Sequence, residues 1–397
     1  MSGRPLVVSL DVTAVPLDPR GAGRYTVELV DALGARDDVD LVLWSRRRDG
    51  DRWHPRHVDA RPGTGDRVVR AIAPGPRPAR LVWEQARLPS LLARQAPPPD
   101  LHHAPHYTMP ERARLPQVVT IHDLTFLDHP EWHERTKVPV FRRAIGVAAR
   151  RASALVCVSE FTARRLRERC HPAGPVFVVP HGVDHARFRV EEPEPGADAA
   201  RLAGLGVRPP FVLFLGTLEP RKAVPTLVGA FDALAPSHPE LTLVLAGGRG
   251  WGADDVDAAL ASSAHRDRVV RTGYVDDEAV PPLLRSAAAV AYPAVEEGFG
   301  LPALEALACG TPLVTTAGSA MAEAAAGGAL LVAPGSRQEL AAALEEALAG
   351  GPAADDRRRL GLEAAARHTW AASAAGHVAA YRAAVERGPS GASGGAR

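Results

Sequence analysis

The sequence is short of cysteine, of long apolar runs and of any excess of one charge. Its 397 residues include three cysteines, Cys157, Cys170 and Cys309. Their odd number and their lack of metal-ligand spacing favour a reducing cytosol over a disulfide framework. The N-terminal run Leu6–Leu10 is too short for a signal sequence, and no later run approaches the roughly 18 residues of a membrane helix. We therefore expect a soluble, cytoplasmic protein.

The 47 lysines and arginines are balanced by 46 acidic residues. This balance predicts no nucleic-acid partner, because no net field attracts polyanions, and a ligand must be recognised locally. It neither supports nor excludes peripheral contact with the inner face of a membrane. Lysine itself is rare, since only Lys137 and Lys222 occur.

Short apolar runs alternate with longer amphipathic stretches, as is typical of parallel α/β units. The chain is too long for one hydrophobic core, so two doubly wound, Rossmann-like domains are predicted. The runs of the first series are Leu6–Leu10, Leu41–Trp44, Gln117–Ile121, Leu155–Val158 and Val176–Val179, with an amphipathic stretch at Tyr25–Leu33. Those of the second are Phe211–Leu215, Leu241–Leu245, Val269–Val270, Ala287–Tyr292 and Leu313–Val314.

Segments without periodicity separate these regions. Residues 191–200 form an acidic, proline-rich stretch, which we predict to be a linker. It would join an N-terminal domain at 1–190 to a C-terminal domain at 201–370. Residues 45–80 are rich in arginine, proline and glycine, and we expect an irregular loop region of the first domain there. The Gly/Ser/Ala-rich tail at 388–397 is expected to be disordered.

The stretch Glu297–Glu305 carries the strongest chemical signal. Two carboxylates flank a glycine turn after the run Ala287–Tyr292, and Pro302 suits the first turn of the next helix. Backbone N–H groups at a helix start bind anions such as a diphosphate, and ionised carboxylates accept hydrogen bonds from pairs of hydroxyls. This arrangement suits a sugar nucleotide. The alternative is a dipole-favoured Glu305 in a helix start and a solvated Glu297.

Two adjacent cations, Arg221 and Lys222, follow the run Phe211–Leu215 and a turn at Gly216. Ligands of open α/β sheets bind at such strand ends. An arginine fork and a lysine point charge can hold a diphosphate and stabilise it as a leaving group. The alternative is a solvated pair at a helix start, but the helix dipole disfavours cations there, which favours a functional role.

Another glycine-containing segment, Gly21-Ala22-Gly23, follows the first strand and lets the backbone approach a ligand, although a simple tight turn explains it equally well. It is not a dinucleotide-binding fingerprint. Thr26 stands where the third glycine would fall, and no acidic residue ends the second strand. A nicotinamide-dependent oxidoreductase is therefore disfavoured.

Histidines and acidic clusters give weaker signals. His122 closes the run Gln117–Ile121 and is a site candidate, although a lone histidine is more often structural. His102, His103 and His106 lack a carboxylate or cysteine at metal-ligand spacing, so we reject a metal site there. The acidic group at 254–257 is interpreted as a charged helix start rather than a cation site.

Taken together, these motifs resemble the retaining nucleotide-sugar glycosyltransferases of family 4, whose GT-B fold has two Rossmann-like domains facing across a cleft. The resemblance covers nearly the whole chain. It is carried by Gly21–Tyr25, Trp83–Gln85, Leu88-Pro89, His122–Leu124, Val158–Phe161, Pro180–Asp184, Gly216–Lys222, Gly273–Val275 and the Glu297–Glu305 loop.

The resemblance implies roles for the matching residues. Glu297 would bind hydroxyls of the donor sugar, and Glu305 would bind the ribose. Arg221 and Lys222 would hold the diphosphate, and His122 would lie beside the transferred sugar. Further donor-binding residues would be Gly21 and Gly23 in a loop that closes over the diphosphate, Gly216, the turn of Gly298, Phe299, Gly300 and Leu301, and Val275 with Asp277 facing the base.

The resemblance also places the acceptor on the domain at 1–190, the nucleotide sugar on that at 201–370, and a helix at 371–387 that crosses back to the N-terminal domain. The chain departs from the family pattern at His181, where Asn is usual, and at Ala223, where Asn, Gly or Asp is usual. The Trp-Glu-Gln and His-Asp-Leu signatures are similar to mannosyltransferases that use GDP-mannose for polysaccharide or glycolipid assembly. Related members with the same motifs use UDP- or other GDP-sugars.

The motifs supply no obvious carboxylate nucleophile, so we expect retention through same-face attack, with the leaving phosphate accepting the acceptor's proton and no metal or other cofactor required. The acceptor would be a glycan, a lipid-linked sugar or a small molecule. Two alternatives are a non-catalytic nucleotide-sugar-binding subunit of a glycan assembly complex and a GT-B sugar-nucleotide epimerase. A glycogen-type phosphorylase would need a Schiff-base lysine, and neither Lys137 nor Lys222 has an obvious cofactor pocket.

Overall fold

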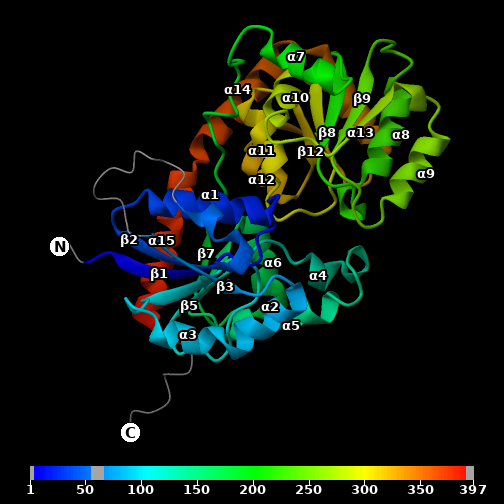
Figure 1. Ribbon diagram of the computed structural model, residues 1–397. Coiled ribbons are helices and arrows are strands. Elements are labelled where there is room, and N and C mark those ends of the chain that lie inside the picture. The colour runs from blue at the N-terminus through cyan, green and yellow to red at the C-terminus, as the bar shows by residue number, and fades with distance from the viewer. Residues whose placement is uncertain (1–3, 55–66, 390–397) are drawn as a thin grey trace. The chain divides into compact units, whose positions relative to one another are not determined.

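The computed structural model describes residues 4–54 and 67–389, which form two compact α/β units (Figure 1). Unit 1 consists of the described parts of Met1–Leu127, Thr136–Gly182 and Trp370–Arg397, and unit 2 consists of Asp128–Arg135 and Val183–Thr369.

The chain enters unit 2 before the predicted linker at 191–200, and helix α7 (Ala197–Gly204) begins inside that linker. The prediction of a linker is therefore wrong at its C-terminal end, over 197–200. Gly196, in the left-handed region at φ 82°, precedes the helix, and Asp198 lies in its first turn. Of the predicted disordered tail, residues 390–397 lie outside the described part of the chain.

Unit 1 contains a seven-stranded sheet in the order β3-β2-β1-β4-β5-β6-β7, and all of its strand pairs are parallel. Strands β1 to β3 extend from the middle of the sheet in one direction and β4 to β7 in the other. The boundary between β1 and β4 is therefore the topological switch point, where open sheets bind ligands at the carboxyl edge. The strands are β1 (Leu6–Asp11), β2 (Val39–Arg46), β3 (Arg67–Ala73), β4 (Leu101–Ala104), β5 (Gln117–Ile121), β6 (Ala154–Cys157) and β7 (Val176–Val178).

Helices cover both faces of this sheet, which explains why strands β1, β5 and β6 are mostly apolar. Side chains Val8 and Leu10 of β1 pack with α1 and α15, and α15 (red) runs beside α1 (blue) in Figure 1. Val7 points to the opposite face, with α2 and α3. The helices are α1 (Ala22–Gly34), α2 (Arg77–Ala86), α3 (Leu88–Arg94), α4 (Thr125–Asp128), α5 (Val138–Arg151), α6 (Glu160–Cys170) and α15 (Trp370–Arg387), with short 3₁₀ turns η1 (Arg47–Asp49) and η2 (Asp51–Trp53). The turn η3 (Pro130–Trp132) lies in the stretch Asp128–Arg135, which belongs to unit 2.

The prediction of an irregular loop region at 45–80 is wrong over 45–54 and 67–80, the described parts of that range. Strand β2 extends to Arg46, η1 and η2 follow, β3 pairs with β2 at the sheet edge, and α2 begins inside the same range. Strand β3 was not predicted because its arginines interrupt the apolar run. Arg67 is satisfied by Asp31 of α1, whose Oδ1 lies 3.3 Å from its Nη1. Residues 55–66 lie outside the described part of the chain.

Unit 2 contains a six-stranded parallel sheet in the order β10-β9-β8-β11-β12-β13, with its switch point between β8 and β11. The strands are β8 (Phe211–Leu215), β9 (Thr242–Ala246), β10 (Val269–Gly273), β11 (Ala289–Tyr292), β12 (Leu313–Thr316) and β13 (Ala329–Val332).

Two groups of helices flank this sheet on opposite faces in Figure 1, one containing α8, α9 and α13 and the other containing α10, α11 and α12. The predicted doubly wound α/β class is confirmed for both units. Among the described residues, no helix is both long enough and apolar enough to cross a membrane. The remaining helices and turns are α8 (Val224–Leu234), α9 (Asp254–Ser262), α10 (Val280–Ser286), α11 (Leu301–Ala308), α12 (Ala320–Ala325), α13 (Arg337–Ala349), α14 (Pro352–Arg367), η4 (Pro220–Lys222) and η5 (Arg266–Arg268).

Candidate functional site

A buried group of opposite charges lies at the switch point of unit 2. Arg221 and Lys222 belong to η4 after β8, and Glu297 belongs to the loop after β11. Lys222 Nζ is ion-paired with Glu297 Oε1, and Arg221 Nη1 lies 2.5 Å from Glu297 Oε2. The side chains of Lys222 and Glu297 are 8% and 9% exposed. The alternatives of a solvated Glu297 and a solvated Arg-Lys pair are therefore wrong.

Tyr292 completes this group, which we call the charged cluster (Arg221, Lys222, Tyr292 and Glu297). Its hydroxyl accepts a hydrogen bond from Lys222 and donates one to Glu297 Oε1 over 3.3 Å. Lys222 Nζ lies 4.6 Å from the tyrosine ring centroid, a cation–π distance. Burial raises the pKa of Tyr292, so the phenol stays protonated. Tyr292 was predicted only to end a strand, although its place at the carboxyl edge of the sheet was a usable signal of a site residue.

Backbone contacts hold the two strand-end loops together. The N–H of Val295 donates to the carbonyl oxygen of Arg221 over 2.8 Å. Arg221 Nε donates to Glu219 Oε2 over 2.9 Å, which fixes the guanidinium near the loop. The following residue, Ala223, adopts φ 51° and ψ 36° and caps α8. This left-handed conformation explains why Asn, Gly or Asp is usual at this position in the family.

Replacing Ala223 with glycine is expected to stabilise unit 2. Relief of the left-handed conformation contributes about 1–2 kcal/mol, and the greater freedom of glycine in the unfolded chain removes about 0.4–1 kcal/mol of it. We expect the free energy of unfolding, measured by urea titration, to rise by roughly 0.5–1 kcal/mol. Ala258→Gly in α9, where the backbone is right-handed, is the matched control and should lower stability by about 1 kcal/mol. Equal effects of the two substitutions would contradict the assignment of strain to Ala223.

The glycine turn after Glu297 opens helix α11. Gly300 is the N-cap at φ 88°, and a Cβ there would lie 2.4 Å from Met321 Cγ, so glycine is required. Pro302 lies in the first turn, as predicted. Glu305 is 4% exposed. Burial raises the pKa of Cys309 to about 12, and the nearby Glu305 carboxylate adds to the rise.

The other unit 2 residues predicted to bind the donor lie at the same edge of this sheet or in the same loop. A Cβ on Gly247, after β9, would lie 2.0 Å from the carbonyl oxygen of Gly216, so the two backbones are in direct contact. Val275 is buried, whereas Asp277 is exposed and its carbonyl oxygen accepts a 2.7 Å hydrogen bond from Arg187. Gly298, Phe299 and Leu301 are buried in the loop that leads into α11. Their roles toward a donor stay predictions.

In unit 1, His122 lies directly after β5 at the carboxyl edge of the sheet. It is buried, its Nε2 lies 2.8 Å from the carbonyl oxygen of Pro105, and its ring meets the ring of Tyr25 edge-on. Burial lowers the pKa of His122, so its imidazole is neutral at pH 7. A neutral imidazole that donates from Nε2 leaves Nδ1 as an acceptor.

The predicted Gly21–Gly23 loop is only partly a loop. Gly21 is the N-cap of α1 at φ 48°, but Gly23 lies inside the first turn of the helix, so the loop prediction is wrong there. A Cβ on Gly23 would approach Pro16 Cδ to 3.1 Å. Packing against Pro16 therefore accounts for a small residue at this position.

The histidines that suggested a metal site are hydrogen-bonded within the core. His102 Nδ1 lies 2.9 Å from Ser9 Oγ, and His103 Nε2 lies 2.8 Å from Thr120 Oγ1. No group of three potential ligands from His, Cys, Asp and Glu is brought together within residues 4–54 and 67–389. The acidic group at 254–257 begins α9, as interpreted, and pairs with Arg249.

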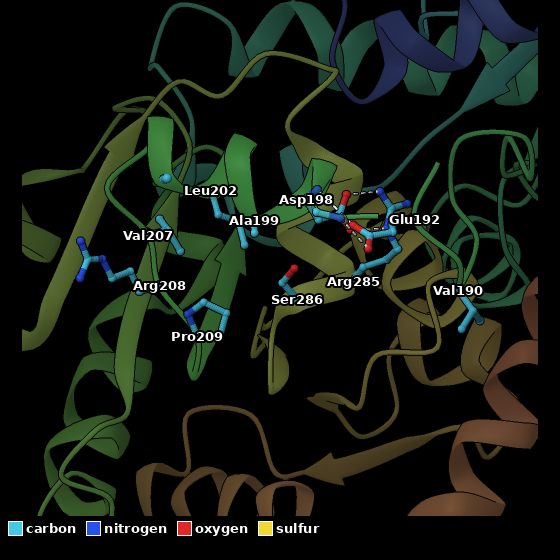
Figure 2. A pocket seen from close by; sticks show the side chains of 12 residues that line it. Val190, Glu192, Asp198, Ala199, Leu202, Val207, Arg208, Pro209, Arg285 and Ser286 are labelled. Carbon is cyan, nitrogen blue, oxygen red and sulfur yellow. Dashed lines mark hydrogen bonds and ion pairs between the residues drawn. The ribbon is translucent and has the colours of Figure 1, made fainter. Parts of the chain in front are cut away.

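A separate hollow of about 540 Å³ in unit 2 lies beside α7 and α10. Figure 2 shows Asp198 and Arg285 facing one another at its wall, where Arg285 Nε and Nη2 donate to the two carboxylate oxygens over 2.6 and 2.7 Å. Glu192 Oε1 and Oε2 accept hydrogen bonds from the backbone N–H groups of Gly196 and Asp198. None of the residues predicted to bind a donor lines this hollow, and the carboxylates of Asp198 and Glu192 already have partners within it.

Comparison with known proteins matches both halves of the chain to glycosyltransferases. Residues 19–187 match Glycosyltransferase Family 4, and residues 203–367 match Glycosyl transferases group 1. D-inositol 3-phosphate glycosyltransferase of Salinispora arenicola is 32% identical over 349 residues, which cover 78% of this chain and 76% of that protein. The chain belongs to glycosyltransferase family 4. O-antigen chain mannosyltransferase B of Escherichia coli is 32% identical over 219 residues, and this match covers 54% of the chain and only 56% of that relative.

Solved structures confirm the fold of this family 4 glycosyltransferase. Sucrose-phosphate synthase from Thermosynechococcus elongatus superposes with a TM-score of 0.75 at 22% identity, covering 95% of this chain and 98% of that one. Anabaena HepE, in complex with UDP and glucose, superposes with a TM-score of 0.70 at 20% identity, again covering 95% of this chain and 98% of that one. The predicted GT-B class is therefore confirmed.

Proposed function

We propose that this enzyme moves a hexosyl group, specifically mannosyl from GDP-mannose, from a nucleotide diphosphate sugar to a hydroxyl of a glycan, glycolipid or small molecule. The observation that carries the proposal is the charged cluster at the carboxyl edge of the unit 2 sheet. The two cations after β8 can bind a diphosphate, and the buried carboxylate after β11 can accept hydrogen bonds from sugar hydroxyls. The likeness to O-antigen chain mannosyltransferase B supports mannose as the sugar.

Arg221 and Lys222 stabilise the diphosphate as it leaves. Negative charge grows on the diphosphate as the glycosidic bond breaks, and two fixed cations stabilise that charge most where water is excluded. They provide the positive charge that a metal ion provides at many other phosphate sites, and we propose that the reaction is metal-independent. Retention follows if the acceptor hydroxyl attacks from the face of the leaving phosphate, which takes up its proton.

Glu297 has two roles in this proposal. Before the donor binds, Glu297 neutralises Lys222 and Arg221 and so permits a cation to be buried at this depth. When the donor binds, phosphate oxygens compete for the same cations, and Glu297 is released to accept hydrogen bonds from sugar hydroxyls. Glu305, buried one helical turn after the glycine loop, binds the ribose, and His122 of unit 1 offers an imidazole acceptor to the transferred sugar.

Thermal shift with a donor panel tests the proposed function. The panel is GDP-mannose, UDP-glucose, UDP-N-acetylglucosamine, GDP and UDP. Ligand at about 100 times Kd contributes about 2.7 kcal/mol, so a clear rise in Tm is expected with GDP-mannose and GDP. Glu305→Ala should abolish the shift, whereas Glu346→Ala on the exposed face of α13 should preserve it. Stabilisation by uridine nucleotides alone would overturn the choice of GDP-mannose, and stabilisation by none would overturn the nucleotide-sugar donor.

A further inference from the structure

A second polar group lies at the switch point of unit 1, between the carboxyl ends of β1 and β4. Asp11 is the last residue of β1, and Glu84 and Arg80 lie one turn apart on α2. Glu84 belongs to the Trp83–Gln85 segment that contributed to the family resemblance without any assigned role. Its position in unit 1 corresponds to that of the charged cluster in unit 2, since open sheets bind ligands at this edge.

Glu84 is buried but incompletely satisfied. It is 4% exposed, and its Oε2 accepts a 2.9 Å hydrogen bond from Thr108 Oγ1. Its Oε1 is also buried, and within the described part of the chain no group lies at hydrogen-bonding distance from it. A buried carboxyl oxygen without a partner is costly and rare in folded proteins, which marks this atom as one that a ligand completes.

A buried carboxylate with a purely structural role looks different in the same protein. Both oxygens of Asp198 are paired with Arg285 at 2.6 and 2.7 Å. Glu84 stands apart because Arg80, although close enough to influence it electrostatically, forms no ion pair with it among the described residues.

The charges around Glu84 favour a hydroxyl-bearing ligand over an ion. Burial and the neighbouring Asp11 raise the pKa of Glu84 to about 8, so it is largely a neutral carboxylic acid at pH 7 and can both donate and accept. Burial also raises the pKa of Asp11. Arg80 supplies a positive charge near both carboxyl groups, and Arg46 and Arg77 lie close to Arg80, so the surroundings disfavour a cationic ligand. Sugar and polyol hydroxyls are themselves both donors and acceptors.

We propose that Glu84, together with Asp11 and Arg80, binds hydroxyl groups of a sugar or polyol acceptor at the carboxyl edge of the unit 1 sheet. This inference rests on the proposed function, because it assigns the acceptor side of the same transfer reaction. Glu84 is then a determinant of acceptor specificity and not of donor binding, which belongs to unit 2.

Saturation-transfer NMR on the full chain tests this assignment with neutral probes: methyl α-D-mannopyranoside, methyl α-D-glucopyranoside, methyl β-D-galactopyranoside and myo-inositol. At least one probe is expected to bind the wild-type protein. Glu84→Ala should weaken that binding about tenfold to a hundredfold, the loss typical of a buried hydrogen bond to a charged or acidic group. Glu84→Gln keeps the volume and an acceptor for Thr108 and should give a smaller loss. Glu168→Gln, on an exposed part of α6, should leave binding unchanged.

The donor thermal shift, measured on the same variants, separates the possible failures. A folded Glu84 variant that keeps the donor shift but loses probe binding supports the proposal. Equal binding of the probe by wild type and both Glu84 variants would overturn it, as would the absence of binding by every probe to the wild type. If no nucleotide sugar stabilises the wild type, the proposed function fails, while Glu84-dependent probe binding would still establish the site in unit 1.

Discussion

Replacing Lys222 with alanine is expected to lower turnover by about a hundredfold to a thousandfold, the usual effect of removing one electrostatic stabiliser of a transition state. Lys222 is buried, paired with Glu297 and in contact with Tyr292, so its charge is held in a dry, fixed position. Such a charge acts most on the negative charge that develops during the reaction. We therefore expect the Kd for the donor, measured by titration, to change much less than kcat.

Variants at the same position test the interpretation. Lys222→Arg keeps the charge but alters its geometry, and should retain more activity than Lys222→Ala. Lys137→Ala removes the other lysine of the chain, before α5 in unit 1, and should leave kcat unchanged. Glu297 keeps Arg221 as a partner in Lys222→Ala, so the variant should fold. Equal losses in kcat and donor affinity would assign Lys222 to ground-state binding instead.

Unit 1 is expected to lose stability steeply below about pH 6.5, because its buried histidines cannot accept protons in the folded state. Burial lowers the pKa of His102 and His106 to about 3 and that of His377 to about 4, and it lowers the pKa of His103 and His122 as well. The unfolded chain takes up these protons near the ordinary histidine pKa. Between that value and about pH 4, the unfolded state therefore binds more protons, and stability falls as pH falls.

Two buried carboxyl groups oppose this trend. The folded-state pKa of Glu84 is raised to about 8, and that of Asp11 is also raised. These two groups therefore add to the free energy of unfolding as the pH falls, and this stabilisation is lost as the pH rises. Each uncompensated proton contributes about 1.4 kcal/mol per pH unit. The five histidines outnumber these two carboxyl groups, so we expect a net fall in the free energy of unfolding of about a few kcal/mol per pH unit below pH 6.

Urea unfolding at several pH values between about 5 and 7.5 measures this slope. His102→Asn removes one titrating group and should flatten the slope by about 1.4 kcal/mol per pH unit, whatever its effect on stability at neutral pH. Gln338→Ala, at an exposed position of α13, removes no titratable group and should leave the slope unchanged. A stability that is independent of pH across this range would contradict the neutral, buried histidines.

These histidines belong to a hydrogen-bonded network that joins α15 to the sheet of unit 1. Tyr381 of α15 bonds His103 Nδ1 over 2.8 Å, and the hydroxyl of Tyr25 lies 2.7 Å from Nε2 of His377, also on α15. Thr120 of β5 connects the two halves of the network. Nothing in the local sequence pairs residues so far apart. The network arises because α1 and α15 pack on the same face of the sheet.

Local sequence signals predicted much of the fold because the central strands are buried on both faces. Runs such as Phe211–Leu215 and Gln117–Ile121 coincide with β8 and β5. Strands β3, β4 and β13 escaped prediction. Strand β13 is short and apolar, whereas β3 and β4 carry polar residues whose partners are distant in sequence. Arg67 of β3 pairs with Asp31, and the two histidines of β4 bond Ser9 and Thr120.

The sequence by itself determined the α/β class, the family motifs and the two strand ends that carry Arg221, Lys222 and Glu297, because these depend on hydrophobic periodicity and on the order of residue types along the chain. Only the tertiary structure decided that the cations and the carboxylate neutralise one another, that Tyr292 joins them, and that an oxygen of Glu84 is buried without a partner. The physical reason is that burial and ion pairing depend on distances between separate strand ends, and those distances are set by the order of strands in each sheet.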